Sequence, residues 1–146
     1  MHNYENLQVW QRAMDLTVRV YKATVHFPSD ERFGLTGQLR RASASIPMNI
    51  AEGSGNASNK EFCRFLEIAL RSGYELLTGI EIAKRLEYLP ESSASDLAKE
   101  LREIISMLVG LMRSLSKSAR TATSLVVVLL LGSWFLALGS LIQGVA

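Results

Sequence analysis

The segment SNKEFCRFLEIALRSGYELLTGIEIAKR, residues 58–85, decides the fold class. Ser58 and Glu61 form a capping box, in which each side chain satisfies a free amide at the start of a helix. From there, apolar and small side chains recur at alternating steps of four and three residues, the heptad spacing of helices that pack nearly parallel. The segment therefore predicts a long helix with one continuous packing seam. The seam positions are Phe62, Leu66, Ala69, Gly73, Leu76, Ile80 and Ala83.

A second helical pattern covers about residues 5–26 and stops at Phe27 and Pro28, because a residue before proline is pushed out of the helical region. Its large apolar side chains recur every three or four residues, which places them on one face of a helix. We expect this face to be buried in the core. Its members are Leu7, Trp10, Met14, Val18, Tyr21 and Val25.

Two more helical segments flank residues 58–85. One begins near Phe33, and the other begins after Pro90, where Ser93 and Asp96 offer a start signal. Four amphipathic helices with short connections predict an all-α, antiparallel (up-down) four-helix bundle over residues 1–118. The core positions expected in these two segments are Leu35, Leu39, Ala42, Ile46, Leu97, Leu101, Ile104, Leu108, Leu111 and Leu115.

Residues 119–146 are expected to form an additional apolar C-terminal helix. None of residues 121–146 is charged, and a helix of this length spans ~39 Å, against ~30 Å of bilayer hydrocarbon. Arg113, Lys117 and Arg120 precede this segment, so the positive-inside rule predicts a cytoplasmic bundle attached to a membrane-spanning tail. Two alternatives stay open, namely a fifth core helix and an accidental extension without a selected function.

The composition excludes several classes of site. The chain has 16 basic and 14 acidic side chains, and a net charge of +2 means that any basic surface is local. Cys63 is the only cysteine, and His2 and His26 are far apart, so we expect no disulfide, metal or cofactor. The first residues lack the charged start and apolar core of a signal peptide, which predicts a cytoplasmic protein.

Pro47 is expected to kink or break the helix that begins near Phe33, because it lacks an N–H and its ring clashes with the preceding turn. Asn49 and Glu52 follow it, and Gly53 is expected to end the segment. An active-site role would need a histidine, nucleophile or metal beside the Glu52 carboxylate, and the sequence offers none. We therefore predict a structural motif, in which Asn49 donates to carbonyls freed by the proline and Glu52 accepts from amides or from Arg40 and Arg41.

Eight short blocks of the sequence follow one another in a characteristic order. They are LQVW from Leu7, FGL from Phe33, QLRRA from Gln38, SIP from Ser45, NIAEG from Asn49, EF from Glu61, RFL from Arg64 and EL from Glu75. Together they resemble a family of four-helix bundles that includes proteins encoded by intervening sequences of 23S ribosomal RNA genes and the accessory variability determinant (Avd) of diversity-generating retroelements. The resemblance implies an antiparallel bundle, a homo-oligomer in the form of a pentameric ring and no enzymatic activity. For Avd it also implies binding of nucleic acid and of a reverse transcriptase.

Seven cations are the predicted contacts to nucleic acid, because guanidinium and ammonium groups pair with phosphate oxygens. The alternative is a solvated helix face, since Glu67 precedes Arg71 and Glu81 precedes Arg85 by four residues, the spacing of exposed ion pairs. Two functions therefore compete: a non-enzymatic, oligomeric nucleic-acid-binding protein and a membrane-anchored scaffold. The seven cations are Arg40, Arg41, Lys60, Arg64, Arg71, Lys84 and Arg85.

Overall fold

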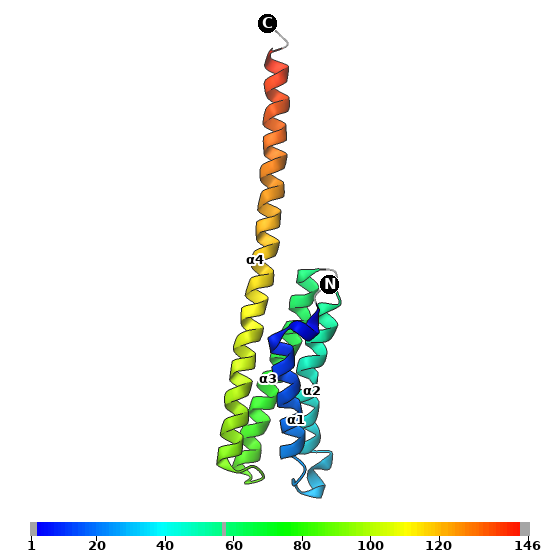
Figure 1. Ribbon diagram of the computed structural model, residues 1–146, viewed down its shortest axis with the longest axis vertical. Coiled ribbons are helices and arrows are strands. Elements are labelled where there is room, and N and C mark those ends of the chain that lie inside the picture. Colours follow the sequence, from blue (N-terminus) through cyan, green and yellow to red (C-terminus); the bar gives the residue numbers. More distant parts are fainter. Residues whose placement is uncertain (1–2, 57, 144–146) are drawn as a thin grey trace.

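The computed structural model describes residues 3–56 and 58–143, with side chains up to Lys117. Four long helices and two short 3-10 turns make up this part of the chain (Figure 1). The long helices are α1 (Gln8–Ala23), α2 (Leu35–Ser54), α3 (Asn59–Arg85) and α4 (Glu91–Gln143), and the turns are η1 (Tyr4–Asn6) and η2 (Ser29–Arg32).

The four helices form an antiparallel bundle, which confirms the predicted fold class. α2 packs between α1 and α3, and α4 closes the bundle against α3 and α1 (Figure 1). The seam predicted in α3 is correct, because all seven of its positions are buried. In α4, Leu97, Leu101, Ile104, Leu108 and Leu115 are buried as predicted. The heptad pattern therefore identified the core face of both helices.

α4 runs without a break from Glu91 to Gln143 and extends far beyond the other three helices (Figure 1). The expected separate C-terminal helix is thus a continuation of α4. Within the residues that the structure describes, no helix has the length and hydropathy of a membrane span. The predicted membrane segment, residues 121–146, lies outside the part of the chain whose side chains are described.

The predicted core face of α1 is wrong for four of its six members, whereas Leu7 and Trp10 are partly buried against the core. The face that packs into the bundle consists of Val9, Ala13, Leu16 and Val20. Met14, Val18, Tyr21 and Val25, which also recur every three or four residues, are exposed. Both faces satisfy helical spacing, and the face with smaller side chains turns inward because it permits close approach to the neighbouring helices.

The ends of α1 are also shorter than predicted. Asn3 caps the short turn η1, and Leu7 then adopts an extended conformation before α1 begins. At the other end, the helix stops before Thr24, whose hydroxyl donates to the Tyr21 carbonyl and accepts from Arg40.

Pro47 lies inside α2 without breaking it, so the break predicted before Met48 is wrong. The proline has no N–H to donate to the Ser43 carbonyl, four residues earlier. Instead, the Thr17 hydroxyl of α1 donates to that carbonyl over 2.9 Å. A neighbouring helix thus supplies the hydrogen bond that the proline removes.

Two glycines permit the close contact between α2 and α3. A Cβ atom on Gly53 would lie 2.7 Å from the Phe62 ring and 2.7 Å from the Phe65 Cβ. A Cβ atom on Gly79 would lie 2.7 Å from a Leu39 methyl group. Gly53 therefore has a packing role that its predicted role as a helix end did not include, although α2 does end at the next residue.

Candidate nucleic-acid interface

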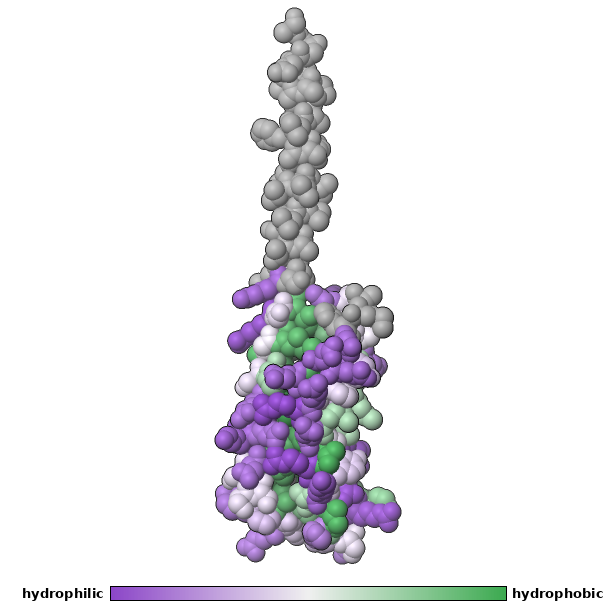
Figure 2. Space-filling view, viewed as in Figure 1, coloured by the Kyte–Doolittle hydropathy of each residue, from purple (hydrophilic) through white to green (hydrophobic). Residues whose placement is uncertain are grey.

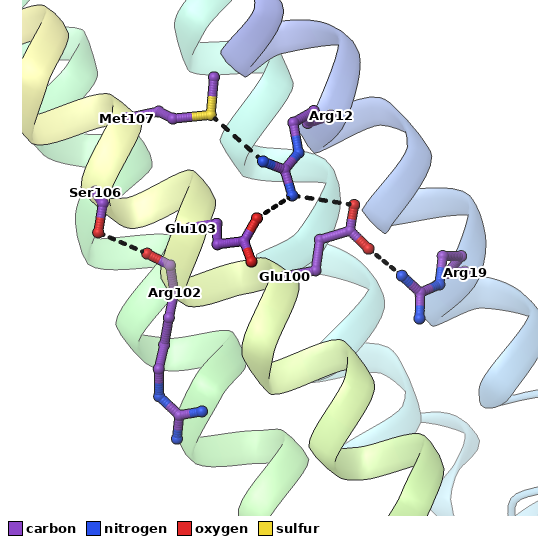
Figure 3. Close-up of polar contacts among 7 residues, drawn as sticks. All are labelled: Arg12, Arg19, Glu100, Arg102, Glu103, Ser106 and Met107. Carbon is purple, nitrogen blue, oxygen red and sulfur yellow. Dashed lines mark hydrogen bonds and ion pairs between the residues drawn. The ribbon is translucent and has the colours of Figure 1, made fainter.

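Ion pairs between α1 and α4 hold two acidic side chains of α4 on the side of that helix that faces α1. Arg12 donates to the Glu103 carboxylate over 2.7 Å and lies 4.0 Å from Glu100, which also pairs with Arg19 (Figure 3). The Arg12 guanidinium also approaches the Met107 sulfur at 3.9 Å. These contacts draw two carboxylates of α4 toward α1.

The ion pair with Arg12 lowers the pKa of Glu103. The hydrogen bond from Arg12 lowers the pKa of this carboxyl below its ordinary value of 4.5. The charged form of Glu103 is therefore favoured in the folded protein. Both side chains are substantially exposed, so the pair contributes little to the free energy of unfolding. Its main effect is to fix the position of the Glu103 carboxylate.

The cations of α4 are left on its outer side. Lys99, Arg102 and Arg113 are exposed, and none has a carboxylate of the described residues within 4.0 Å. Figure 3 shows the Arg102 guanidinium pointing away from Glu100 and Glu103. We call Lys99, Arg102 and Arg113 the α4 basic row. It extends ~21 Å along the helix axis.

The five predicted cations of α3 differ in their partners. Lys60 and Arg71 have no carboxylate within 4.0 Å in the described structure, so the predicted pair between Glu67 and Arg71 does not form. Arg64 pairs with Glu61 over 2.9 Å and lies over the Phe65 ring. Lys60 and Arg71 therefore leave part of α3 unneutralised.

At the C-terminal end of α3, the predicted pairing of Glu81 with Arg85 is confirmed. Arg85 and Lys84 each lie 2.9 Å from the Glu81 carboxylate, and Lys84 also lies 3.7 Å from Glu91. Hydrogen bonds from Arg85 and Lys84 lower the pKa of Glu81, and the bond to Glu81 raises the pKa of Lys84. Lys84 and Arg85 are thus the two predicted cations that are most fully neutralised.

Two shallow grooves lie between α3 and α4, one toward each end of their contact. The groove of about 610 Å³ has Lys60, Arg64, Cys63 and Leu115 in its lining. The groove of about 490 Å³ has Lys84 and Arg102 in its lining. We call the surface formed by the grooves, the α3 cations and the α4 basic row the α3–α4 face. Carboxylates also line both grooves, Glu61 and Glu67 in the first and Glu81 in the second, so each groove carries charges of both signs.

Arg40 and Arg41 lie away from this face. Arg40 donates to the hydroxyl of Thr24, the residue that follows α1, over 2.9 Å. It also stacks over the ring of Tyr21 in α1, at 5.0 Å from the ring centroid. Arg41 donates to the Gln38 side chain over 2.6 Å within α2. The structure therefore divides the seven predicted cations between two surfaces.

The residues around Pro47 serve packing and local hydrogen bonding. Asn49 donates to the Ser45 carbonyl over 2.8 Å and to its hydroxyl over 3.0 Å, and Ser45 meets Ser72 of α3 at 2.8 Å. Asn49 therefore donates near the proline as predicted, although to Ser45 rather than to the carbonyl that Pro47 frees. Glu52 is exposed and lies about 18 Å along the helix from Arg40, so the predicted contact between them is wrong.

No three ligand-type side chains are close enough to hold a metal ion in the described part of the chain. Cys63 is a free, partly buried thiol whose sulfur lies 3.8 Å from the Met112 carbonyl. These groups offer no assembled nucleophile, base and oxyanion site. The chemistry that the α3–α4 face can perform is electrostatic binding of anions.

Comparison with known proteins agrees with this architecture. Residues 5–110 match the family described as 23S rRNA-intervening sequence protein. The chain belongs to this family. A solved structure from the S23 ribosomal protein family of Bacteroides thetaiotaomicron, described as a protein with unknown function, has 26% identity and a TM-score of 0.65. The match covers 71% of this chain and 97% of that one. No curated protein matches this family member.

The α4 basic row escaped the sequence analysis, which examined the apolar seam of α4 and treated Arg113 only as a flank of the tail. The usable signal was the spacing of opposite charges. Arg12 and Arg19 lie seven residues apart, and Glu100 and Glu103 lie three apart, so each pair shares a helix face. That spacing predicts a contact between α1 and α4. The basic side chains on the outer side of α4 are then left without carboxylate partners.

Proposed function

We propose that this family member is a non-enzymatic, homo-oligomeric protein that binds nucleic acid through the α3–α4 face. The observation that carries the proposal is a group of exposed cations on this face with no carboxylate within 4.0 Å among the described residues, namely Lys60, Arg71 and the α4 basic row. Such cations can replace the counterions condensed on a phosphate backbone.

The size of the row suits a nucleic-acid strand. Each strand of a duplex carries one phosphate per ~3.4 Å of helix axis, so the ~21 Å of the α4 basic row lies along about six phosphates. The contacts are to phosphates, since residues 91–117 of α4, whose side chains the structure describes, contain no aromatic residue. We therefore expect binding with little sequence preference by a single copy.

Assembly into a homo-oligomer repeats the α3–α4 face, which binds only weakly in a single copy. The net charge of +2 on one chain supports modest binding, and repetition of the α3–α4 face around an assembly raises the overall affinity without new contacts. The family resemblance favours a ring of five copies as the assembly.

Salt dependence of binding tests the proposal. The full-length protein in mild detergent is titrated against a fluorescent 30-nucleotide RNA hairpin and a DNA duplex of matched length, over a range of salt concentrations. The double variant Arg71→Gln/Arg102→Gln removes two cations of the α3–α4 face. Its plot of log affinity against log salt is expected to be shallower by roughly 1.4–1.8, because each lost phosphate contact contributes about 0.7–0.9.

The matched control is Arg32→Gln/Arg41→Gln, which removes the same charge from exposed positions off the face. This variant is expected to keep the wild-type slope. Wild-type affinity that does not change with salt contradicts the proposal, and so does an equal loss of slope in both double variants. A change confined to the α3–α4 variant supports it.

A further inference from the structure

Three aromatic side chains are exposed in the part of the chain whose side chains the structure describes. They are Tyr21, Phe33 and Tyr74, with exposed fractions of 44%, 86% and 53%. Figure 2 shows that hydrophilic side chains cover much of the visible face of the bundle, with hydrophobic residues between them. Aromatic rings are often found at binding surfaces, because they combine a large apolar area with a specific stacking geometry. These three rings are therefore candidate contacts to a planar ligand.

The three rings differ in what lies over them. The Arg40 guanidinium lies 5.0 Å from the centroid of the Tyr21 ring, and the Arg32 guanidinium lies 5.4 Å from that of Phe33. Among the described residues, neither a guanidinium nor a second ring is stacked on Tyr74. The Tyr74 ring is therefore the one that is free to stack on a ligand in this part of the chain.

Tyr74 lies on α3 between the two grooves of the α3–α4 face. Glu67, seven residues before it, lines the groove of about 610 Å³. Thr78, four residues after it, lines the groove of about 490 Å³. Residues that are four or seven positions apart lie on the same side of a helix. The Tyr74 ring therefore belongs to the α3–α4 face, near the middle of its length.

A cation lies close to Tyr74 on each of the two helices. Arg71 is three residues earlier on α3, so its side chain is a neighbour on the helix surface. Gly73 packs directly on α4, because a Cβ atom there would lie 3.2 Å from the Ile105 side chain. Arg102 is three residues before Ile105, so it lies at about the level of Tyr74. Both arginines have no carboxylate within 4.0 Å in the described structure.

We propose that the Tyr74 ring stacks on an unpaired base of a nucleic-acid strand whose phosphates contact Arg71 and Arg102. The inference rests on the proposed binding of nucleic acid by the α3–α4 face and adds a contact to a base. A duplex gains nothing from this ring, because its bases already stack on one another. The contact accepts any base, since every base has a π-face.

Removal of the ring tests the inference. The full-length protein in mild detergent is titrated against an unstructured RNA of about 12 nucleotides and an RNA duplex of the same length. Tyr74→Ala is expected to weaken binding of the single strand roughly tenfold, the contribution of one stacked base, and to change duplex binding by less than about twofold. Tyr74→Phe keeps the ring and is expected to bind both RNAs as the wild type does. Tyr74 is more than half exposed, so neither substitution disturbs the core.

Salt dependence separates stacking from charge. Stacking releases no counterions, so Tyr74→Ala is expected to lower the affinity for the single strand at every salt concentration without changing the slope of log affinity against log salt. Arg71→Gln/Arg102→Gln is expected to change the slope instead. Phe33→Ala is the matched control, because it removes an exposed ring outside the α3–α4 face and should leave both affinities unchanged.

The outcomes distinguish this inference from the proposed function. If Tyr74→Ala weakens both RNAs equally, or neither, the stacking contact is overturned, while salt-dependent binding by the wild type still supports the proposed function. A loss in Tyr74→Phe or Phe33→Ala as large as that in Tyr74→Ala also overturns the stacking contact. If the wild type binds neither RNA in a salt-dependent manner, both proposals are overturned.

Discussion

Gly53 shows how a single missing side chain sets the distance between two helices. A methyl group there would lie 2.7 Å from both Phe62 and Phe65, which are held in the opposing helix. Gly53→Ala is therefore expected to destabilise the bundle by about 1–3 kcal/mol, the usual cost of overpacking a filled core. The free energy of unfolding in urea measures the effect on the full-length protein.

Gly110→Ala is the control for that substitution. Gly110 lies on the exposed side of α4 with no described heavy atom within 4 Å of the Cβ position. Alanine there is expected to stabilise the helix by about 0.5–1 kcal/mol, because glycine loses more backbone entropy on folding. Equal effects of the two substitutions would contradict a packing role for Gly53.

The sequence predicted that Gly53 matters, but for a different reason. A glycine near the end of a periodic segment reads as a helix terminator, and α2 does end at Ser54. The close approach to Phe62 and Phe65 depends on how α2 and α3 cross, which the periodicity of either helix alone does not specify. Gly79, which meets Leu39 in the same way, gave no terminator signal and was missed.

At the scale of the helix, α2 tolerates Pro47 because α1 completes its hydrogen bonding. Thr17→Val removes the donor to the buried Ser43 carbonyl and is expected to cost about 1–2 kcal/mol, since an unsatisfied buried acceptor is penalised. In a Pro47→Ala background, the new backbone N–H can bond to Ser43. The same Thr17→Val change is then expected to cost about 1 kcal/mol less, as a double-mutant cycle in urea would measure.

Thr78→Val controls for the hydroxyl itself. Thr78 is exposed and donates to the Tyr74 carbonyl in its own helix, as Thr17 can toward Ala13, but its hydroxyl makes no hydrogen bond to a neighbouring helix in the described structure. Its replacement is expected to change stability by less than about 0.5 kcal/mol. Independent effects of Thr17→Val and Pro47→Ala would show that Thr17 does not compensate for the proline.

The helix scale is also where sequence analysis of α1 failed. α1 carries two faces of apolar residues, and periodicity favoured the one with the larger side chains. The buried face includes Ala13 and Val20, which allow Thr17 to reach the Ser43 carbonyl across the helix pair. The choice between the faces is made by tertiary packing, which leaves Met14, Val18 and Tyr21 of the other face exposed.

At the scale of the whole molecule, the heptad seams of α3 and α4 were sufficient to predict an antiparallel bundle, because they specify long helices with one buried face each. The candidate binding face was predicted only in part. Lys60 and Arg71 lie on it, but Arg40 packs over Tyr21 of α1. Lys99 and Arg102 join it because ion pairs with α1 draw Glu100 and Glu103 away, a sorting that depends on the arrangement of all four helices.

The proposed assembly predicts how affinity depends on the length of the nucleic acid. Each copy in a homo-oligomer carries one α3–α4 face, so the assembly presents several binding faces at once. An RNA long enough to reach two faces is expected to bind the wild type on the order of 100-fold more tightly than one that reaches a single face. Fluorescence anisotropy with RNAs of increasing length measures this difference. At protein concentrations low enough to separate the copies, long and short RNAs should bind with similar affinity, whereas a length effect retained by separated copies would show that one chain holds the whole site.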